Sequence, residues 1–91
     1  MTSTNCRLEI QNEKGLHARA SAKFVETVER FEARADVTKD GMTVSGDSIM
    51  GLLMLAAAKG CFIEVKTSGA DALPLMKAIT NLIDNKFDEG K

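Results

Sequence analysis

The stretch ARADVTKDGMTVS, residues 33–45, contains the pattern that decides the fold. From residue 33 to residue 39, small or branched apolar side chains alternate with charged or polar ones, which predicts a strand with one buried face. The dipeptide Asp40-Gly41 follows, and it is typical of a tight turn between antiparallel strands. Residues 42–45 are expected to form the returning strand, so the middle of the chain is predicted to be a β-hairpin.

The segments on either side of this hairpin alternate between strand and helix patterns. Before it, residues 6–11 have the two-residue period of a strand, and Ala18 to Arg30 has the spacing of an amphipathic helix. After it, Ser48 has the character of a helix cap before an apolar run at residues 49–58, which is expected to be helical. Residues 61–66 alternate again as a strand. A closing helix is expected to carry the apolar stripe Leu75, Met76, Ile79, Leu82 and Ile83.

The order β-α-β-β-α-β-α defines the expected fold class. Short strands with helical connections favour an α+β open-faced sandwich, in which a four-stranded antiparallel sheet carries three helices on one face. The 91 residues are within the usual size of one domain, so residues 1–91 are expected to form a single one. The mixed-charge tail, residues 84–91, is expected to be a frayed end.

The composition argues against several function classes. Twelve basic and thirteen acidic residues give a net charge of -1, which provides no general attraction to nucleic acid. The sequence has no Tyr or Trp, so a base-stacking platform is not expected. The apolar run at residues 49–58 is too short to cross a membrane, and the polar N-terminus lacks the apolar core of a secretory signal. A cytoplasmic protein without membrane insertion is therefore expected.

The cysteines do not indicate a metal site. Cys6 and Cys61 lie far apart in the sequence and form no CxxC pair, and with a single histidine they make a poor zinc-binding set. We expect reduced thiols, no bound metal ion and no cofactor.

The single histidine, His17, stands between a polar loop that contains Gly15 and the expected start of a helix. The unpaired amides of a helix start attract anions and favour a neutral, nucleophilic imidazole. Arg19 adds a guanidinium that suits phosphate oxygens. These features indicate a histidine that could accept a phosphoryl group. A histidine that serves as a solvated helix cap is the alternative interpretation.

Two segments of the chain resemble the histidine-containing phosphocarrier family, HPr. Gly15-Leu16-His17-Ala18-Arg19, continued by residues 20–25, is similar to the active-site segment of that family. Asp47-Ser48-Ile49-Met50-Gly51 and Ala58-Lys59-Gly60 are similar to its regulatory serine segment. The spacing of the segments, the chain length and the element order agree as well, from about Cys6 to Phe87.

The resemblance implies a phosphocarrier of the phosphoenolpyruvate-dependent phosphotransferase system. Such proteins accept a phosphoryl group from phosphorylated Enzyme I and pass it to an IIA-type acceptor, without enzymatic turnover of their own. By position, His17 would be phosphorylated at Nδ1 and Arg19 would stabilise the charge, with Ala18 and Ala20 contributing at the helix start. Transfer would then depend mostly on positioning in a complex of two exposed sites. The carrier is expected to be a monomer.

The sequence departs from the family pattern at two positions. Ala20 stands where the family usually has Pro, which restores a backbone donor and leaves the helix entry looser, so altered transfer rates are expected. The next residue, Ser21, is expected to be an exposed helix serine, with a hydroxyl near the phosphate as the alternative. Asp47 stands where members that serve sugar transport often carry Lys, and this places an acid next to Ser48.

Ser48 has a structural and a regulatory interpretation that are compatible. It is expected to cap a helix, and the resemblance also marks it for phosphorylation if the cell has an HPr kinase/phosphorylase. A phosphate at a helix start is tolerated locally. Its negative charge would nonetheless weaken the binding of Enzyme I by repulsion.

The helix after Ser48 has more apolar side chains than packing on a sheet requires. The excess suggests a docking patch beside His17, and methionine suits a surface that meets several partners. Lys14, Lys23 and Arg19 could rim this patch and meet acidic partners. The residues expected in the patch are Ile49, Met50, Leu53 and Met54.

Other functions remain open from the sequence. A regulatory module on the same fold could act by docking to partners without phosphoryl relay, and a small-molecule sensor or nucleic-acid module could share the scaffold. Within the family, the sugar-transport branch and the nitrogen-related branch, NPr, have the same histidine segment. Ser68-Gly69-Ala70-Asp71 is similar to the first branch, whereas Lys86-Phe87-Asp88-Glu89 is more similar to the second.

Overall fold

The structure, a computed structural model, describes residues 2–90 and has the predicted succession of strands and helices. The strands are β1 (Ser3–Glu9), β2 (Arg34–Lys39), β3 (Met42–Ser45) and β4 (Phe62–Ser68). The helices are α1 (Ala18–Glu29), α2 (Ile49–Met54) and α3 (Ala72–Asp84), and a short 3-10 turn, η1 (Lys86–Asp88), follows them. The antiparallel open sheet with its three helices confirms the predicted fold class.

The sheet has the strand order β1-β4-β2-β3, and every neighbouring pair is antiparallel. The hairpin predicted from residues 33–45 is present, with Val37 opposite Val44. β4 lies between β1 and β2, so that Val65 faces Cys6 on one side and Val37 on the other. The last strand in the chain therefore joins the first strand to the hairpin.

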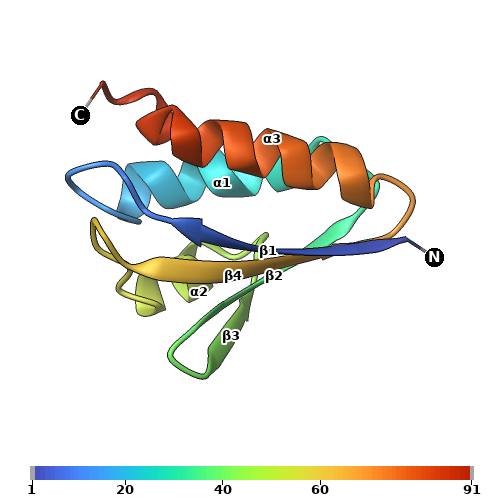
Figure 1. Ribbon diagram of the computed structural model, residues 1–91, viewed down its shortest axis with the longest axis horizontal. Coiled ribbons are helices and arrows are strands. Elements are labelled where there is room, and N and C mark those ends of the chain that lie inside the picture. The colour runs from blue at the N-terminus through green and yellow to red at the C-terminus, as the bar shows by residue number, and fades with distance from the viewer. Residues whose placement is uncertain (1, 91) are drawn as a thin grey trace.

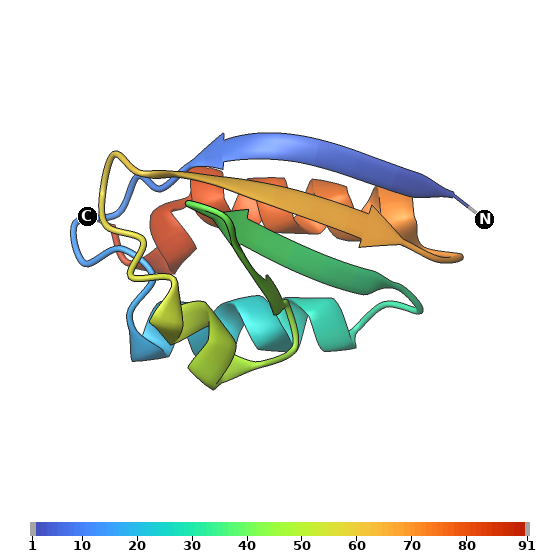
Figure 2. The same ribbon diagram turned by 90° about the horizontal axis from the view of Figure 1, so that it is seen from below.

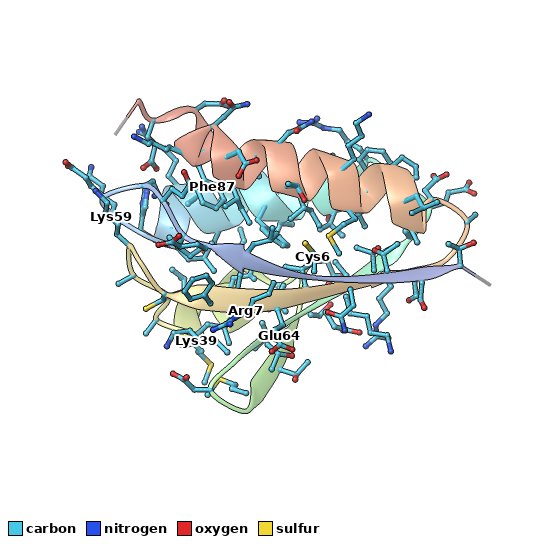
Figure 3. The ribbon with its side chains drawn as sticks, in the orientation of Figure 1. Cys6, Arg7, Lys39, Lys59, Glu64 and Phe87 are labelled. Atoms are coloured by element: carbon cyan, nitrogen blue, oxygen red, sulfur yellow. The ribbon has the colours of Figure 1, made fainter. Side chains whose placement is uncertain are left out.

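The helices α1 and α3 lie side by side along one face of the sheet (Figure 1), and α2 packs beside α1 near β3 (Figure 2). The alternation of side chains along the strands explains why only one face is covered. Cys6 lies on the helix side, whereas Arg7 and Glu64 lie on the opposite, open face (Figure 3). The largest fully buried side chains between the layers include Phe24, Ile63, Leu75, Ile79 and Ile83.

The loop from β1 to α1 runs against the loop from α2 to β4. The Ile10 amide donates to the Cys61 carbonyl over 2.9 Å, and the Gly60 amide donates to the Ile10 carbonyl over 2.8 Å. Further along, the Leu16 amide donates to the Ala57 carbonyl over 2.8 Å. These hydrogen bonds hold the start of α1 beside the end of α2.

The helix α2 is shorter than the sequence pattern predicts. It ends at Met54 and not at Ala58, because Ala56 adopts a left-handed conformation with φ of +50°. This turn brings the Ala57 carbonyl to the Leu16 amide and buries the side chains of Leu55 and Ala57. An alanine is an unusual residue for this conformation, so the sequence contained no signal for the stop.

The expectation of a frayed tail is wrong for the described residues after α3. Lys86, Phe87 and Asp88 all have positive φ, so the chain turns sharply after α3 and η1 packs against that helix. The Phe87 side chain is fully buried near the C-terminal end of α3 (Figure 3), and its carbonyl accepts a 2.6 Å hydrogen bond from Lys23 Nζ. Burial of this ring offsets the strain of the turn.

Candidate functional site

His17 is the residue immediately before α1, with extended backbone and with its carbonyl accepting a 2.8 Å hydrogen bond from the Ser21 amide. Its backbone therefore occupies the cap position. Its imidazole makes no capping bond to the helix amides, and the side chain is 28% exposed. The interpretation of His17 as a solvated side-chain cap thus does not describe the ring, which is turned toward the end of the chain.

The imidazole of His17 contacts Glu89, a residue from the tail. His17 Nε2 lies 2.5 Å from Glu89 Oε2, and the other carboxyl oxygen, Oε1, accepts a 3.0 Å hydrogen bond from Asn12 Nδ2. The buried amide of Asn12 also donates to the Gly15 carbonyl over 2.8 Å. A chain of hydrogen bonds therefore links the loop before α1 to the imidazole through a carboxylate.

The hydrogen bonds to Glu89 favour the ionised form of its carboxyl group. Desolvation by itself raises the pKa of the Glu89 carboxyl, but the hydrogen bonds from Asn12 and His17 and the nearby Lys14 together hold that pKa below its ordinary value. Glu89 is therefore an ionised acceptor at neutral pH. Neither Asn12 nor Glu89 was among the residues predicted for the site.

Gly15 allows the histidine loop to approach the end of α2 closely. Its φ is +63°, and a Cβ at this position would lie 2.4 Å from the Ala57 carbonyl oxygen.

The prediction for Ser21 is wrong, because this serine is fully buried and its hydroxyl donates to the Leu16 carbonyl over 3.3 Å. The residues on both sides of His17 are thus fixed by backbone contacts.

Arg19 and His17 line the same open pocket, of about 620 Å³. Arg19 is exposed and forms no ion pair with any described residue. The first amides of α1, including those of Ala18 and Ala20, have no acceptor within the helix. The side chain of Ala20, the residue that stands where the family usually has Pro, is fully buried. The other residues that line the pocket are Glu13, Lys14, Ala18, Lys23, Asp88 and Glu89.

The helix α2 lies beside His17 and exposes part of its apolar surface. Met50 is 69% exposed and Met54 is 64% exposed, while Ile49 is exposed to a lesser degree. Leu53 is half-buried and lines a second, smaller pocket together with His17 and Lys14. The four residues predicted for a docking patch therefore extend from the histidine along one helix.

Ser48 caps α2, as predicted. Its hydroxyl oxygen accepts a 3.0 Å hydrogen bond from the Gly51 amide, and the side chain is half-buried. The neighbouring Asp47 is exposed, and its carboxylate accepts a 2.6 Å hydrogen bond from the Ser45 hydroxyl.

Neither a metal-binding cluster nor a membrane-spanning helix is found in the described part of the chain. Within residues 2–90, no group of three or more His, Cys, Asp or Glu side chains could hold a metal ion. None of the described helices has both the length and the apolar character needed to cross a membrane.

Comparisons with known proteins agree with this geometry. The family model for the PTS HPr component phosphorylation site matches residues 4–85. The chain is 54% identical over 84 residues to the phosphocarrier protein HPr of Neisseria meningitidis, a match that covers 92% of this chain and 94% of that protein. The crystal structure of HPr-C-His from Thermoanaerobacter tengcongensis is similar with a TM-score of 0.90 and 37% identity, covering 94% of this chain and 97% of the other. The HPr structure from Bacillus anthracis has a TM-score of 0.86 and 35% identity, covering 91% and 99%.

The fold and the sequence matches define a phosphocarrier of the phosphotransferase system. The chain belongs to the HPr family, as the two motif segments predicted.

Proposed function

We propose that this protein accepts a phosphoryl group on His17 from phosphorylated Enzyme I and passes it to an IIA-type acceptor. The observation that carries the proposal is the partly exposed imidazole at the start of α1, in an open pocket shared with Arg19. An open pocket suits a carrier, because donor and acceptor proteins must both reach the same nitrogen atom.

The residues around His17 have distinct roles in this proposal. The free amides at the start of α1, at Ala18 and Ala20, donate to the phosphoryl oxygens, and the helix dipole favours their negative charge. Arg19, with no ion pair among the described residues, is available to pair with the same oxygens. These groups stabilise the phosphohistidine without enclosing it, so the phosphoryl group can leave again.

Partner docking is assigned to the exposed side chains of α2. Ile49, Met50, Leu53 and Met54 form an apolar surface next to the histidine, which suits a protein that binds donor and acceptor in turn. The exposed Lys14 at the edge of this surface favours acidic partners.

Regulation through Ser48 is a second part of the proposal. The hydroxyl of Ser48 is half-buried and bonded to the Gly51 amide, so a kinase of the HPr kinase/phosphorylase type would have to release this cap. Phosphorylation would then place negative charge within the docking surface and weaken binding of Enzyme I. Asp47 already contributes a negative charge next to this serine.

The competing function is a regulatory module that docks to partners without phosphoryl relay. It uses the same α2 surface and does not require the imidazole. Partner binding that survives His17→Ala, together with a wild type that gains no phosphoryl group, is the result that this alternative predicts.

The test is the intact mass of the protein after incubation with phosphoenolpyruvate and Enzyme I from the same organism. Wild type is expected to gain one acid-labile phosphoryl group, and His17→Ala is expected to gain none while its thermal unfolding shows that it is folded. Glu64→Gln, at an exposed position on the open face of the sheet, is the matched control and should behave as wild type. An unmodified wild type in the presence of charged Enzyme I would overturn the proposal.

A further inference from the structure

The carboxylate of Glu89 reaches His17 from outside the part of the chain that the family model matches. The family model matches residues 4–85, so Glu89 lies beyond it. The side chain of Glu89 is nevertheless only 13% exposed and lies 2.5 Å from His17 Nε2. Two anchors support this placement, since the Phe87 ring is fully buried and Lys23 Nζ donates to the Phe87 carbonyl.

We propose that Glu89 is a positioning residue for phosphoryl transfer, because its carboxylate holds the His17 proton on Nε2 and leaves the lone pair on Nδ1. The inference rests on the proposed function, in which Nδ1 accepts the phosphoryl group. A neutral imidazole carries one proton, and the nitrogen that faces a strong acceptor keeps it. The nucleophilic nitrogen is then the one that faces away from the carboxylate.

A hydrogen bond from Asn12 to the second carboxyl oxygen of Glu89 keeps this carboxylate an acceptor. Asn12 Nδ2 donates to Glu89 Oε1 over 3.0 Å and to the Gly15 carbonyl over 2.8 Å. The Asn12 amide is fully buried, so this double contact fixes the direction of its donor group. The depressed pKa of Glu89 keeps the carboxylate ionised, and an ionised carboxylate accepts hydrogen bonds but cannot donate them.

Phosphoryl transfer to His17 can be followed bond by bond when the ring proton is on Nε2. The Nδ1 lone pair of neutral His17 attacks phosphorus and forms the N–P bond, while the bond from phosphorus to the donor's leaving atom breaks and that atom keeps the electron pair. The proton on Nε2 stays in place, so the phosphorylated ring acquires a positive charge. The carboxylate of Glu89 is adjacent to that developing charge and stabilises it. Transfer to the acceptor protein reverses these changes.

The proposal is tested with Glu89→Gln, which keeps the size of the side chain but has only one acceptor oxygen for two donors. The hydrogen bond to the Gly15 carbonyl fixes the direction of the Asn12 NH₂ group. The side-chain oxygen of the new Gln is therefore expected to accept from Asn12, and its amide NH₂ is expected to face His17 Nε2. The proton of the ring should then move to Nδ1. Ring ¹⁵N chemical shifts of the neutral histidine report this directly, and Glu89→Ala should give a mixture of both tautomers.

Kinetics provide the second measurement. With Enzyme I as donor, Glu89→Gln is expected to transfer at least about 10-fold to 100-fold more slowly, the loss seen when a carboxylate that orients a metal-ligating histidine is removed. The KM for the carrier should stay unchanged, because Glu89 lies outside the α2 docking surface. Glu64→Gln removes the same charge from the open face of the sheet, away from the pocket of His17, and it should change neither the tautomer nor the rate.

The outcomes separate this inference from the proposed function. If Glu89→Gln leaves the proton on Nε2, or transfers at the wild-type rate, the positioning role is wrong even when wild type is phosphorylated. If wild type itself gains no phosphoryl group, the proposed function fails, and the ¹⁵N shifts still decide whether Glu89 sets the tautomer.

Discussion

At the scale of single residues, the site depends on a close contact between two loops. Gly15 has a left-handed backbone and lies against the Ala57 carbonyl, so no larger residue fits without displacing the loop that holds His17. Gly41, in the hairpin turn, also has a left-handed backbone, but a Cβ there would meet nothing within 4 Å. The two glycines therefore separate the effect of backbone conformation from that of steric contact.

Gly15→Ala is expected to destabilise the protein more than Gly41→Ala. The left-handed backbone costs about 1–2 kcal/mol for alanine at either position. At Gly15 the clash with Ala57 adds to this, for a total of about 3 kcal/mol or more. Urea denaturation of both variants measures the difference. Equal losses of unfolding free energy would show that the contact between the loops is not tight.

At the scale of secondary-structure elements, two short segments position the surroundings of His17. The helix α2 is held at its start by Ser48, whose hydroxyl accepts a hydrogen bond from the Gly51 amide. The turn η1 is held by the buried Phe87 ring and places Glu89 against the imidazole. Neither segment is long enough to be stable by its own backbone hydrogen bonds, so side-chain contacts such as these stabilise each of them.

Removal of the α2 cap is expected to have a moderate effect. Ser48→Ala should lower the free energy of unfolding by about 1 kcal/mol, because the Gly51 amide loses its acceptor. Ser48→Asn keeps a capping oxygen and should stay close to wild type. Chemical denaturation compares the two variants, and an unchanged stability of Ser48→Ala would contradict the capping role.

Removal of the Phe87 ring is expected to have a larger effect. Phe87→Ala should destabilise the protein by about 3 kcal/mol, as is typical for a fully buried phenylalanine. It should also release Glu89 and make the His17 ring ¹⁵N shifts resemble those of Glu89→Ala. Leu73→Ala, at a side chain 63% exposed on α3, is the control and should have little effect. Comparable losses for both variants would mean that the tail is not packed in solution.

At the scale of the whole molecule, the sequence predicted the local elements but did not predict the contacts between residues far apart in the chain. The hairpin at residues 33–45 and the helix before it follow from periodicity within a short window. His17 and Arg19 could be predicted together because they are neighbours in one motif. Glu89 contacts His17 from 72 positions away, and only the path of the tail creates that contact.

The features that were missed had weak signals in the sequence. Phe87 is an aromatic residue among charged ones, and this was the one indication that the tail packs on the core. The end of α2 at Met54 depends on a left-handed Ala56, which no residue preference predicts. β4 lies between β1 and β2 in the sheet. The alternation of side chains predicts which face of a strand is buried, but it does not predict which strands pair.

The most direct measurement is NMR of the ¹⁵N-labelled protein after phosphorylation with phosphoenolpyruvate and a catalytic amount of Enzyme I. Coupling between phosphorus and a ring nitrogen identifies the atom that carries the phosphoryl group. We expect the coupling at His17 Nδ1, with the proton still on Nε2. Phosphorus on Nε2, on another residue, or on no residue while Enzyme I is charged would contradict the assignment of His17 Nδ1 as the acceptor.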